Sequence, residues 1–345
     1  MPEMKKTLPL LAGLLVWSLP AAAQLPPAGR ADYLAALALE YRADGSADHQ
    51  AAAARYQAAA EAGSREAILA LARLSEPGGP LWQGPELWRG RLLAASRAGW
   101  PEAAYDLARA LEAQTLSGLD PQPFYLQAAA AGHAQAALRL GLLYLDGQAG
   151  LPKDEVQAAL WLTVAAEKHE AQGALALGRM YYDEQPDLAR RWLERAESAE
   201  GAYLLGELYL KDRRFIEALS AFTSAADRGY PPANLALGLL ELDNDFGRHP
   251  NPRAALRHFK IAAQADLPEG SYQLARMYLL GRATPKDSIT GAFWLNRAAA
   301  RGHGPAREEF GKVTYNFSVG QKKRLERMIA DGVAPTTQVP VKNQN

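Results

Sequence analysis

Two apolar patterns alternate along the chain, and together they predict helices that come in pairs. The first pattern is a leucine followed by alanine or glycine, often with a tyrosine three positions after the small residue. Its small residues are Ala38, Ala72, Ala108, Gly141, Gly178, Gly206, Gly238 and Ala275. The gaps between them are 34, 36, 33, 37, 28, 32 and 37 residues. This spacing lies close to the period of about 34 residues that is typical of helix–turn–helix repeats.

The second pattern lies in the second half of each repeat. A bulky aromatic residue precedes two neighbouring small residues, and a glycine often closes the unit. The aromatic residues are Tyr56, Tyr125, Trp161, Phe222, Phe259 and Trp294. Spacings of three and four residues place such side chains on one helix face, where small residues allow another helix to approach. The sequence therefore predicts an all-α fold, a right-handed α-solenoid of about eight helix–turn–helix repeats.

Polar residues and glycines mark the ends of the predicted helices. Asp120 and Asn251 each precede a proline, the order expected for an N-cap followed by the first helical residue. Asp154 and Asp287 stand seven residues before a tryptophan and are predicted to cap the second helices of their repeats. The closing glycines suit the left-handed conformation that follows many helices. They are Gly63, Gly99, Gly132, Gly229 and Gly302.

Residues 1–23 have the three parts of a secretory signal peptide. Lys5 and Lys6 precede an apolar stretch from Leu8 to Leu19, and three alanines at positions 21–23 supply small residues for cleavage. An uncleaved anchor is the alternative, although the apolar stretch is short for a membrane span. The chain contains no cysteine, so no lipid-bearing cysteine follows this stretch. We expect a periplasmic chain, or a secreted one, with no membrane span after cleavage.

The rest of the chain divides into three predicted parts. The repeat pattern predicts a solenoid over residues 24–304. Ser318 and Gln321 have the spacing of a capping box, which predicts a helix within a C-terminal capping region over residues 305–331. A terminal helix of this kind shields the last repeat of an array from solvent. Residues 332–345 are predicted to be a disordered tail.

Two insertions interrupt the repeats and predict loops. They cover residues 78–85 and 244–250, and both are rich in glycine, proline or polar residues. Insertions in repeat arrays often map to a binding face, which makes Trp82 and Phe246 candidate partner-binding residues. The alternative is that both loops are tolerated surface insertions.

Arginine occupies one position of the first pattern, directly after the small residue, in four repeats. These candidate partner-binding residues are Arg73, Arg109, Arg179 and Arg276. Because equivalent positions align along a solenoid, they are candidates for a basic stripe that faces an acidic protein or an anionic polysaccharide. Glu207 interrupts the row. Arginines on a solvated helix face are the alternative.

Composition and charge exclude several classes of protein. The 345 residues include 38 basic and 38 acidic side chains, so a nucleic-acid partner that depends on bulk positive charge is not expected. The absence of cysteine excludes disulfides, thiolate zinc sites and cysteine nucleophiles. None of the six histidines stands in a metal-binding spacing, and His133, His169 and His303 are expected to be solvated turn residues. We identify no catalytic, metal-binding or cofactor-binding residue, and we predict a protein that is not an enzyme and uses no cofactor.

The repeat pattern resembles the Sel-one-like repeat, a subfamily of the tetratricopeptide-like α-solenoids. Its fullest copies join L-G-x-x-Y to K-D, a tryptophan and a pair of alanines, as in residues 140–166 and, from the tyrosine onward, residues 278–299. The resemblance covers residues 31–304. It implies a scaffold for protein–protein contacts rather than a catalyst.

Residues 177–302 also look like the C-terminal repeats of the periplasmic scaffold lipoproteins of alginate secretion, through L-G-R-x-Y-Y at residues 177–182 and the Leu205-Gly206 pair. Such scaffolds link an outer-membrane porin to periplasmic polymer-modifying enzymes. The resemblance implies a non-catalytic adaptor for synthesis and export of an alginate-like or cellulose-like exopolysaccharide. The chain departs from that family in lacking the lipid-bearing cysteine. Two alternatives remain: a secreted effector or host-contact repeat protein, and an envelope polysaccharide or peptidoglycan hydrolase.

Overall fold

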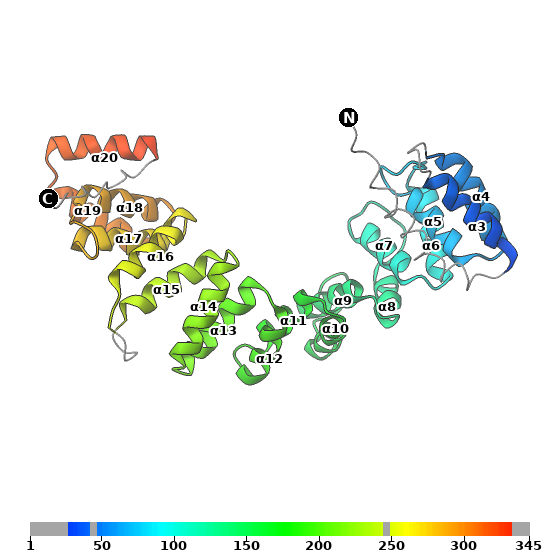
Figure 1. Ribbon diagram of the computed structural model, residues 1–345, viewed down its shortest axis with the longest axis horizontal. Helices are drawn as coiled ribbons and strands as arrows, with labels where there is room; N and C mark the ends of the chain where they lie inside the picture. The colour runs from blue at the N-terminus through cyan, green and yellow to red at the C-terminus, as the bar shows by residue number, and fades with distance from the viewer. Residues whose placement is uncertain (1–26, 42–46, 244–248, 333–345) are drawn as a thin grey trace, which may run out of the picture. The chain divides into compact units, whose positions relative to one another are not determined.

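A computed structural model describes residues 27–41, 47–243 and 249–332 of the chain. Within these ranges the chain forms eighteen α-helices and no β-strand, and the helices follow one another in pairs (Figure 1). The chain divides into two compact units, one up to Ala176 and one from Leu177 onward. The all-α repeat fold predicted from the sequence is confirmed.

The described helices are distributed over the two units as follows. Unit 1 contains α3 (Pro27–Glu40), α4 (His49–Glu61), α5 (Arg65–Leu74), α6 (Pro85–Arg97), α7 (Pro101–Glu112), α8 (Gln122–Ala130), α9 (Ala134–Asp146) and α10 (Glu155–Glu167). The boundary between the units lies inside α11 (Ala171–Met180). Unit 2 contains α12 (Pro186–Ala196), α13 (Ala199–Lys211), α14 (Phe215–Asp227), α15 (Pro231–Leu242), α16 (Pro252–Gln264), α17 (Pro268–Leu280), α18 (Ser288–Ala300), α19 (Gly304–Tyr315) and α20 (Val319–Asp331).

The odd-numbered helices from α3 to α17 carry the first sequence pattern, and each is followed by an even-numbered partner from α4 to α18. We refer to them as A helices and B helices. Inside each unit, a B helix packs both against the A helix before it and against the A helix of the next repeat. A chain of such contacts builds a continuous core from units that are each too small to bury their own apolar faces.

Small residues on the A helices let the B helices approach closely. A Cβ atom added to Gly206 would lie 2.7 Å from Cδ1 and Cε1 of Phe222, a ring that is only 1% exposed. A Cβ atom added to Gly238 would lie 2.5 Å from Cε1 of Phe259. Both distances are far inside the separation of about 3.5–4.0 Å at which carbon atoms attract. The equivalent contacts elsewhere are Gly141 with Leu162 and Gly178 with Leu193.

In one repeat the bulky residue of the B helix is a leucine, not the tryptophan that the sequence pattern indicates. Leu162 packs against Gly141 and is fully buried, whereas Trp161 is only partly buried. Leu162 stands three residues before Ala165, the same spacing that separates the aromatic residue from the first alanine in four other repeats, at Tyr56, Tyr125, Phe222 and Phe259. Trp161 therefore lies one position away from the face that meets the A helix. Its Nε1 is buried without a hydrogen-bond partner among the described residues.

Three of the four predicted N-caps are present at the helix starts. The exception is Asp120, because α8 begins at Gln122 with Pro121 at the N-cap position, although Asp120 Oδ1 accepts the Gln122 N–H at 3.0 Å. Asp154 Oδ1 accepts hydrogen bonds from the backbone N–H groups of Val156 and Gln157, both at 2.9 Å. Asp287 caps α18 in the same way, and Asn251 caps α16. The five closing glycines all have φ between +82° and +91°, the left-handed conformation that glycine adopts at low cost. These signals define where each helix ends.

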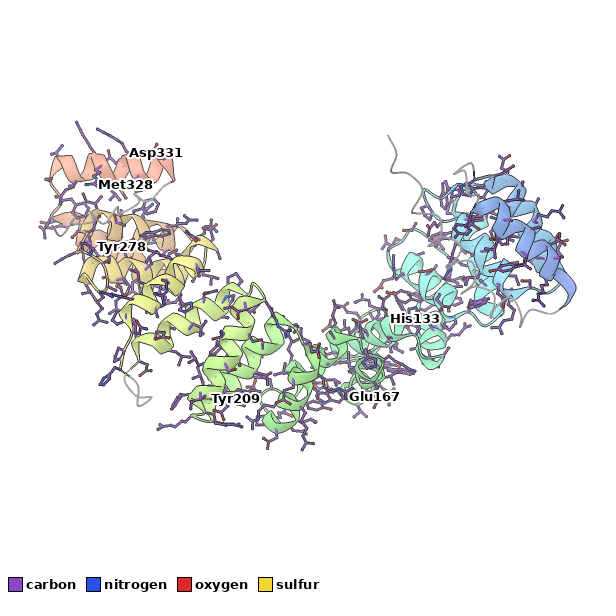
Figure 2. The ribbon with its side chains drawn as sticks, viewed as in Figure 1. His133, Glu167, Tyr209, Tyr278, Met328 and Asp331 are labelled. Carbon is purple, nitrogen blue, oxygen red and sulfur yellow. The ribbon has the colours of Figure 1, made fainter. Side chains whose placement is uncertain are left out.

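Two of the histidines expected to be solvated are helix caps packed against tyrosines. His133 lies at the start of α9 (Figure 2). Its Nδ1 accepts a backbone N–H at 3.2 Å, and its ring stacks on Tyr105 at 4.5 Å between centroids. His303 caps α19 in the same way and stacks on Tyr272 at 4.6 Å. Nδ1 can accept a hydrogen bond only when it carries no proton. His169, by contrast, is an exposed turn residue as predicted.

Two helices follow the last repeat, one more than the capping pattern predicts. The extra helix is α19. The predicted capping box opens α20, where Ser318 and Gln321 each accept the other's backbone N–H. Leu325 and Met328 of α20 join the apolar core that contains Trp294. Figure 2 labels Met328 on this helix. The helix α20 therefore covers the end of unit 2.

Some predictions concern residues outside the described ranges. The signal peptide predicted over residues 1–23, the loop residue Phe246 and the tail from residue 333 onward belong to this group. Among the helices that the structure describes, none has both the length and the apolar character needed to cross a lipid bilayer.

We expect Gly206→Ala to destabilise unit 2 by about 1–3 kcal/mol, because the new methyl group overlaps the buried Phe222 ring and forces the two helices apart. Gly311→Ala is the matched control in the same unit. A Cβ atom at Gly311 of α19 meets nothing within 4 Å, so the helix propensity of alanine should stabilise the protein by about 0.5–1 kcal/mol. Thermal unfolding followed by circular dichroism measures both. Equal effects of the two substitutions would contradict the packing role of Gly206.

The cap at His133 predicts a pH-dependent stability. Burial lowers the pKa of His133, and the carboxylates of Glu102 and Asp106 oppose this shift only in part. Since the unfolded histidine has a pKa of about 6.5, the unfolded chain takes up the proton first. The contribution of His133 is therefore complete above pH ~6.5 and is lost as the pH falls through the lowered pKa of the folded state.

His133→Asn keeps a side chain that can cap the helix but removes the titration. We expect the urea midpoint of this variant to fall less between pH 7.5 and pH 5.5 than that of the unaltered protein. The variant His169→Asn, at an exposed turn, should keep the original pH dependence. If the urea midpoints of His133→Asn and His169→Asn fall by the same amount between these pH values, protonation of His133 does not cause the loss of stability.

Candidate protein-binding surface

In four repeats the residue after the small residue of the A helix is an exposed arginine. One residue turns a helix by about 100°, so a position next to a buried alanine or glycine can reach the surface. The four candidate arginines are all exposed, on α5, α7, α11 and α17; they are Arg73, Arg109, Arg179 and Arg276. The structure thus places all four at equivalent surface positions of their repeats.

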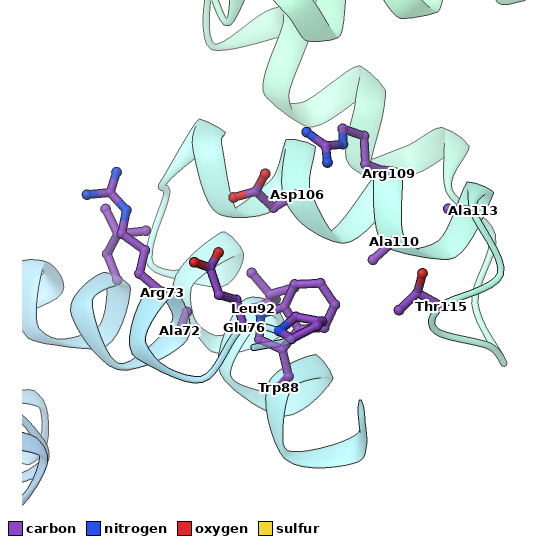
Figure 3. A pocket seen from close by; sticks show the side chains of 12 residues that line it. Ala72, Arg73, Glu76, Trp88, Leu92, Asp106, Arg109, Ala110, Ala113 and Thr115 are labelled. Carbon is purple, nitrogen blue, oxygen red and sulfur yellow. The ribbon is translucent and has the colours of Figure 1, made fainter. Parts of the chain in front are cut away.

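In unit 1, two of these arginines line the same pocket. Arg73 of α5 and Arg109 of α7 border a hollow of about 370 Å³, whose lining also includes residues of α6 (Figure 3). Its apolar walls include Leu69, Trp88 and Leu92, which belong to the core of the unit. We refer to this hollow as the α5–α7 pocket. It is a concave site close to the lower limit of about 300 Å³ for small ligand pockets.

Carboxylates make the α5–α7 pocket mixed in charge rather than basic. Glu76, just after α5, and Asp106 of α7 line it together with the two arginines (Figure 3). Burial raises the pKa of Asp106, although the nearby Arg109 and Arg73 act in the opposite direction. The burial of this carboxylate is therefore not fully compensated by its neighbours. Sequence reasoning missed Asp106, yet it stands three residues before Arg109, a spacing that puts both on one helix face.

Trp82 lies in the predicted loop between α5 and α6, next to this pocket. Its side chain is 37% exposed, and its ring meets that of Trp88 edge-on with 6.2 Å between centroids. Trp88 in turn lines the α5–α7 pocket. Trp82 is thus held against the pocket wall while part of its ring remains accessible to a partner.

In unit 2, the other two arginines have different neighbours. Arg179 forms an ion pair with Glu200 of α13. Arg276 lies over the ring of Tyr272, 5.8 Å from the ring centroid. Arg109 of unit 1 has the same kind of contact, at 5.7 Å from the centroid of Tyr105. The four arginines therefore do not share a common environment.

Unit 2 also has a pocket that sequence reasoning missed, between α13 and α15. Its lining includes Tyr203, Glu207 and the exposed Leu239. Glu207 accepts hydrogen bonds from the hydroxyl groups of Tyr203, at 3.0 Å, and Tyr182, at 3.3 Å. In the sequence Glu207 only interrupts the row of arginines. The available signal is the spacing of four residues between Tyr203 and Glu207, which places them on one face of α13.

Sel1 repeats account for much of this architecture. The Sel1 repeat family matches the chain at residues 134–170, 169–199, 231–267 and 268–303. These segments contain the helix pairs from α9 to α12 and from α15 to α18. Residues 134–199 and 231–303 are therefore Sel1 repeats, and the described helix pairs have the arrangement of a tetratricopeptide-like α-solenoid. Repeats of this kind form scaffolds for protein–protein interaction.

Two curated proteins are similar to parts of the chain. The chain is 26% identical over 224 residues to chitin synthase regulatory factor 3 of Schizosaccharomyces pombe, which covers 63% of this chain and 22% of that protein. It is 30% identical over 121 residues to the exopolysaccharide production negative regulator of Rhizobium leguminosarum bv. viciae, which covers 31% of this chain and 45% of that protein. The chain thus spans less than half the length of each of these relatives.

Two solved structures have a similar fold. The first is c5321, a protective antigen of uropathogenic Escherichia coli with an SLR fold. It has a TM-score of 0.70 and 20% sequence identity, and the match covers 96% of this chain and 76% of the antigen. The second is a Sel1 repeat protein of Oxalobacter formigenes, at a TM-score of 0.64, 20% identity and coverage of 91% and 97%. At this identity the similarity shows the fold alone.

We expect Arg73→Ala and Arg109→Ala to change the free energy of unfolding by less than about 0.5 kcal/mol, since both side chains are exposed. Arg139→Ala is the contrasting variant. Arg139 Nε lies 3.0 Å and 3.1 Å from the two carboxylate oxygens of Glu112, which also accepts the Tyr125 hydroxyl at 2.6 Å. Loss of the Arg139 side chain should lower the free energy of unfolding by about 1–2 kcal/mol, because Glu112 loses its ionic partner. Solvent screening of this partly exposed pair keeps the loss from being larger. Urea unfolding measures all three, and a large loss from Arg73→Ala would show a structural role.

Proposed function

We propose that this chain is a non-catalytic adaptor in a complex that synthesises and exports an exopolysaccharide. The observation that carries the proposal is the array of Sel1 repeats combined with the similarity to the Rhizobium leguminosarum protein named as an exopolysaccharide production negative regulator. The fungal relative is also named for the regulation of a polysaccharide synthase. Both relatives are named for the regulation of polysaccharide production.

The resemblance of residues 177–302 to alginate-secretion scaffolds supports a more specific arrangement. In this proposal the partners are other envelope proteins, namely an outer-membrane porin or polymer-modifying enzymes. Exposed positions of the A helices would contact them, since a solenoid offers many such positions along its length. An anionic polysaccharide is the alternative ligand for the arginines.

The proposed location is the periplasm. The proposal rests on the sequence of residues 1–23, in which two lysines precede an apolar stretch and three alanines. A non-catalytic role is supported by the Sel1 repeats and by the lack of any recognised catalytic motif in the sequence. Specificity would then reside in exposed side chains, while the buried residues maintain the fold.

Deletion of the gene should abolish export of the polymer while synthesis continues, because an adaptor connects the two steps without performing either. The measurement compares extracellular polymer with polymer retained in the cell. Expression of the gene in trans is the control and should restore export. Normal export in the deletion strain would contradict the adaptor role, and increased export would favour a negative regulator instead.

Cell fractionation separates the remaining alternatives. The proposal expects the mature chain in periplasmic fractions. Recovery of most of the protein from the culture medium would favour a secreted effector or host-contact protein. Hydrolysis of purified peptidoglycan or exopolysaccharide by the purified chain would favour an enzyme and contradict the adaptor role.

A further inference from the structure

The α5–α7 pocket gathers four charged side chains that have no ionic partner. Arg73, Glu76, Asp106 and Arg109 line it, and none of them forms an ion pair or a side-chain hydrogen bond within the part of the chain that the structure describes. Arg109 contacts the ring of Tyr105. By contrast, Arg139 of α9 and Glu112 of α7 form an ion pair. The four charged side chains of the pocket surround a hollow and remain available to a ligand.

The signs of these charges limit what the pocket can accept. Two guanidinium groups and two carboxylates sum to zero at neutral pH. A polyanion would gain two attractive contacts but would also meet two like charges, which disfavours it. A polycation would be attracted by the two carboxylates but repelled by the two guanidinium groups. The ligand that fits this arrangement carries an anionic group at one point and hydrogen-bond donors at another.

Asp106 determines where the donors are needed. It is more buried than the arginines at the rim, and its burial is only partly compensated by them. A carboxylate that loses water without gaining hydrogen bonds is costly, so a ligand that donates N–H groups to it gains affinity. The main chain of a peptide carries such donors at every residue except proline.

The apolar walls of the pocket also favour a ligand that carries an apolar group. Leu69, Leu92 and Trp88 line the hollow and belong to the core of unit 1. A volume of about 370 Å³ accommodates a few side-chain groups and not a second helix or a folded domain.

We propose that the α5–α7 pocket binds a short peptide segment of a partner protein, with an apolar side chain against Leu69 and Trp88 and a neighbouring acidic side chain paired with the exposed guanidinium group of Arg73 or Arg109. Main-chain N–H groups of the segment donate to Asp106. The proposal rests on the protein-binding function proposed above and adds the chemistry of the partner. The apolar residue provides most of the buried area, and the two arginines provide the selectivity for acid over base.

The register of the repeats explains why this binding site is local. Arg73 and Arg109 occupy the same position in two consecutive repeats, on A helices that line one pocket. The next A helix in unit 1 has Leu142 at this position. In unit 2, Arg179 is already paired with Glu200. Among the four arginines, only this pair combines neighbouring repeats with a shared hollow.

The test is a selection from a phage-displayed library of random twelve-residue peptides on the purified full chain, with parallel selection on Arg73→Ala/Arg109→Ala. The chain should enrich peptides in which Leu, Ile, Met or Phe stands next to Asp or Glu. A synthetic copy of an enriched peptide should lose at least about tenfold in affinity for the double variant, because the charge-assisted contact of its acidic residue is removed. Replacement of its acidic residue by the amide should cause a similar loss.

Arg179→Ala/Arg276→Ala is the matched control, since both residues occupy the same motif position outside this pocket. It should bind the synthetic peptide as tightly as the unaltered chain. The proposal is overturned if no peptide is enriched on the unaltered chain relative to the double variant, or if the enriched peptides are basic. It is also overturned if a soluble oligouronate binds the chain and loses that binding in Arg73→Ala/Arg109→Ala, because the pocket then accepts an anionic polysaccharide.

The peptide selection tests the binding pocket, whereas the gene deletion tests the adaptor role in polymer export. Peptide binding with normal polymer export would retain the pocket and reject the pathway. Abolished export with no peptide selection would retain the adaptor role and place the contact elsewhere on the chain. Circular dichroism spectra of both double variants establish that they fold, as the exposure of the four arginines predicts.

Discussion

The contact between a small residue on each A helix and a bulky residue on its B helix is the constraint on which each unit depends. At Gly206 and Gly238 the aromatic ring of the B helix occupies the space where a Cβ atom would stand. Close-packed interiors cannot absorb an extra methyl group without displacing neighbours. Because a B helix also packs on the next A helix, a change in one such contact is passed to the following repeat. The spacing of the helices, and with it the shape of each pocket, follows from these contacts.

That constraint also separates residues that maintain the fold from residues that are free to bind. The small residue faces its B helix, and the residue after it is exposed where it is one of the four arginines. This position carries the exposed Arg73 and Arg109 in two repeats and the partly buried Leu142 in the next. Binding specificity in such an array can therefore change from repeat to repeat while the core stays constant. The mixed charges of the α5–α7 pocket are one local result.

The sequence predicted the fold well because its signals are local. The repeat period, the caps at Asp154 and Asp287 and the closing glycines all act within one or two helical turns, and each was confirmed. Predictions failed where a residue's role depends on a neighbouring repeat. His133 was expected to be solvated, but the ring of Tyr105, on the preceding A helix, turns it into a packed cap. Trp161 was assigned to the inner face because it is aromatic, although the helical register gives that place to Leu162.

The sequence by itself determined that this protein is an array of paired helices, since a period near 34 residues and paired small residues favour that arrangement over others. It also marked the exposed arginines as equivalent positions. Only the tertiary structure decided that two of them share a hollow with Glu76 and Asp106, while Arg179 is paired with Glu200. The physical reason is distance along the chain. Side chains from different helices meet only after the helices have packed, and the closeness of that packing is determined by buried residues far from the charges that it brings together.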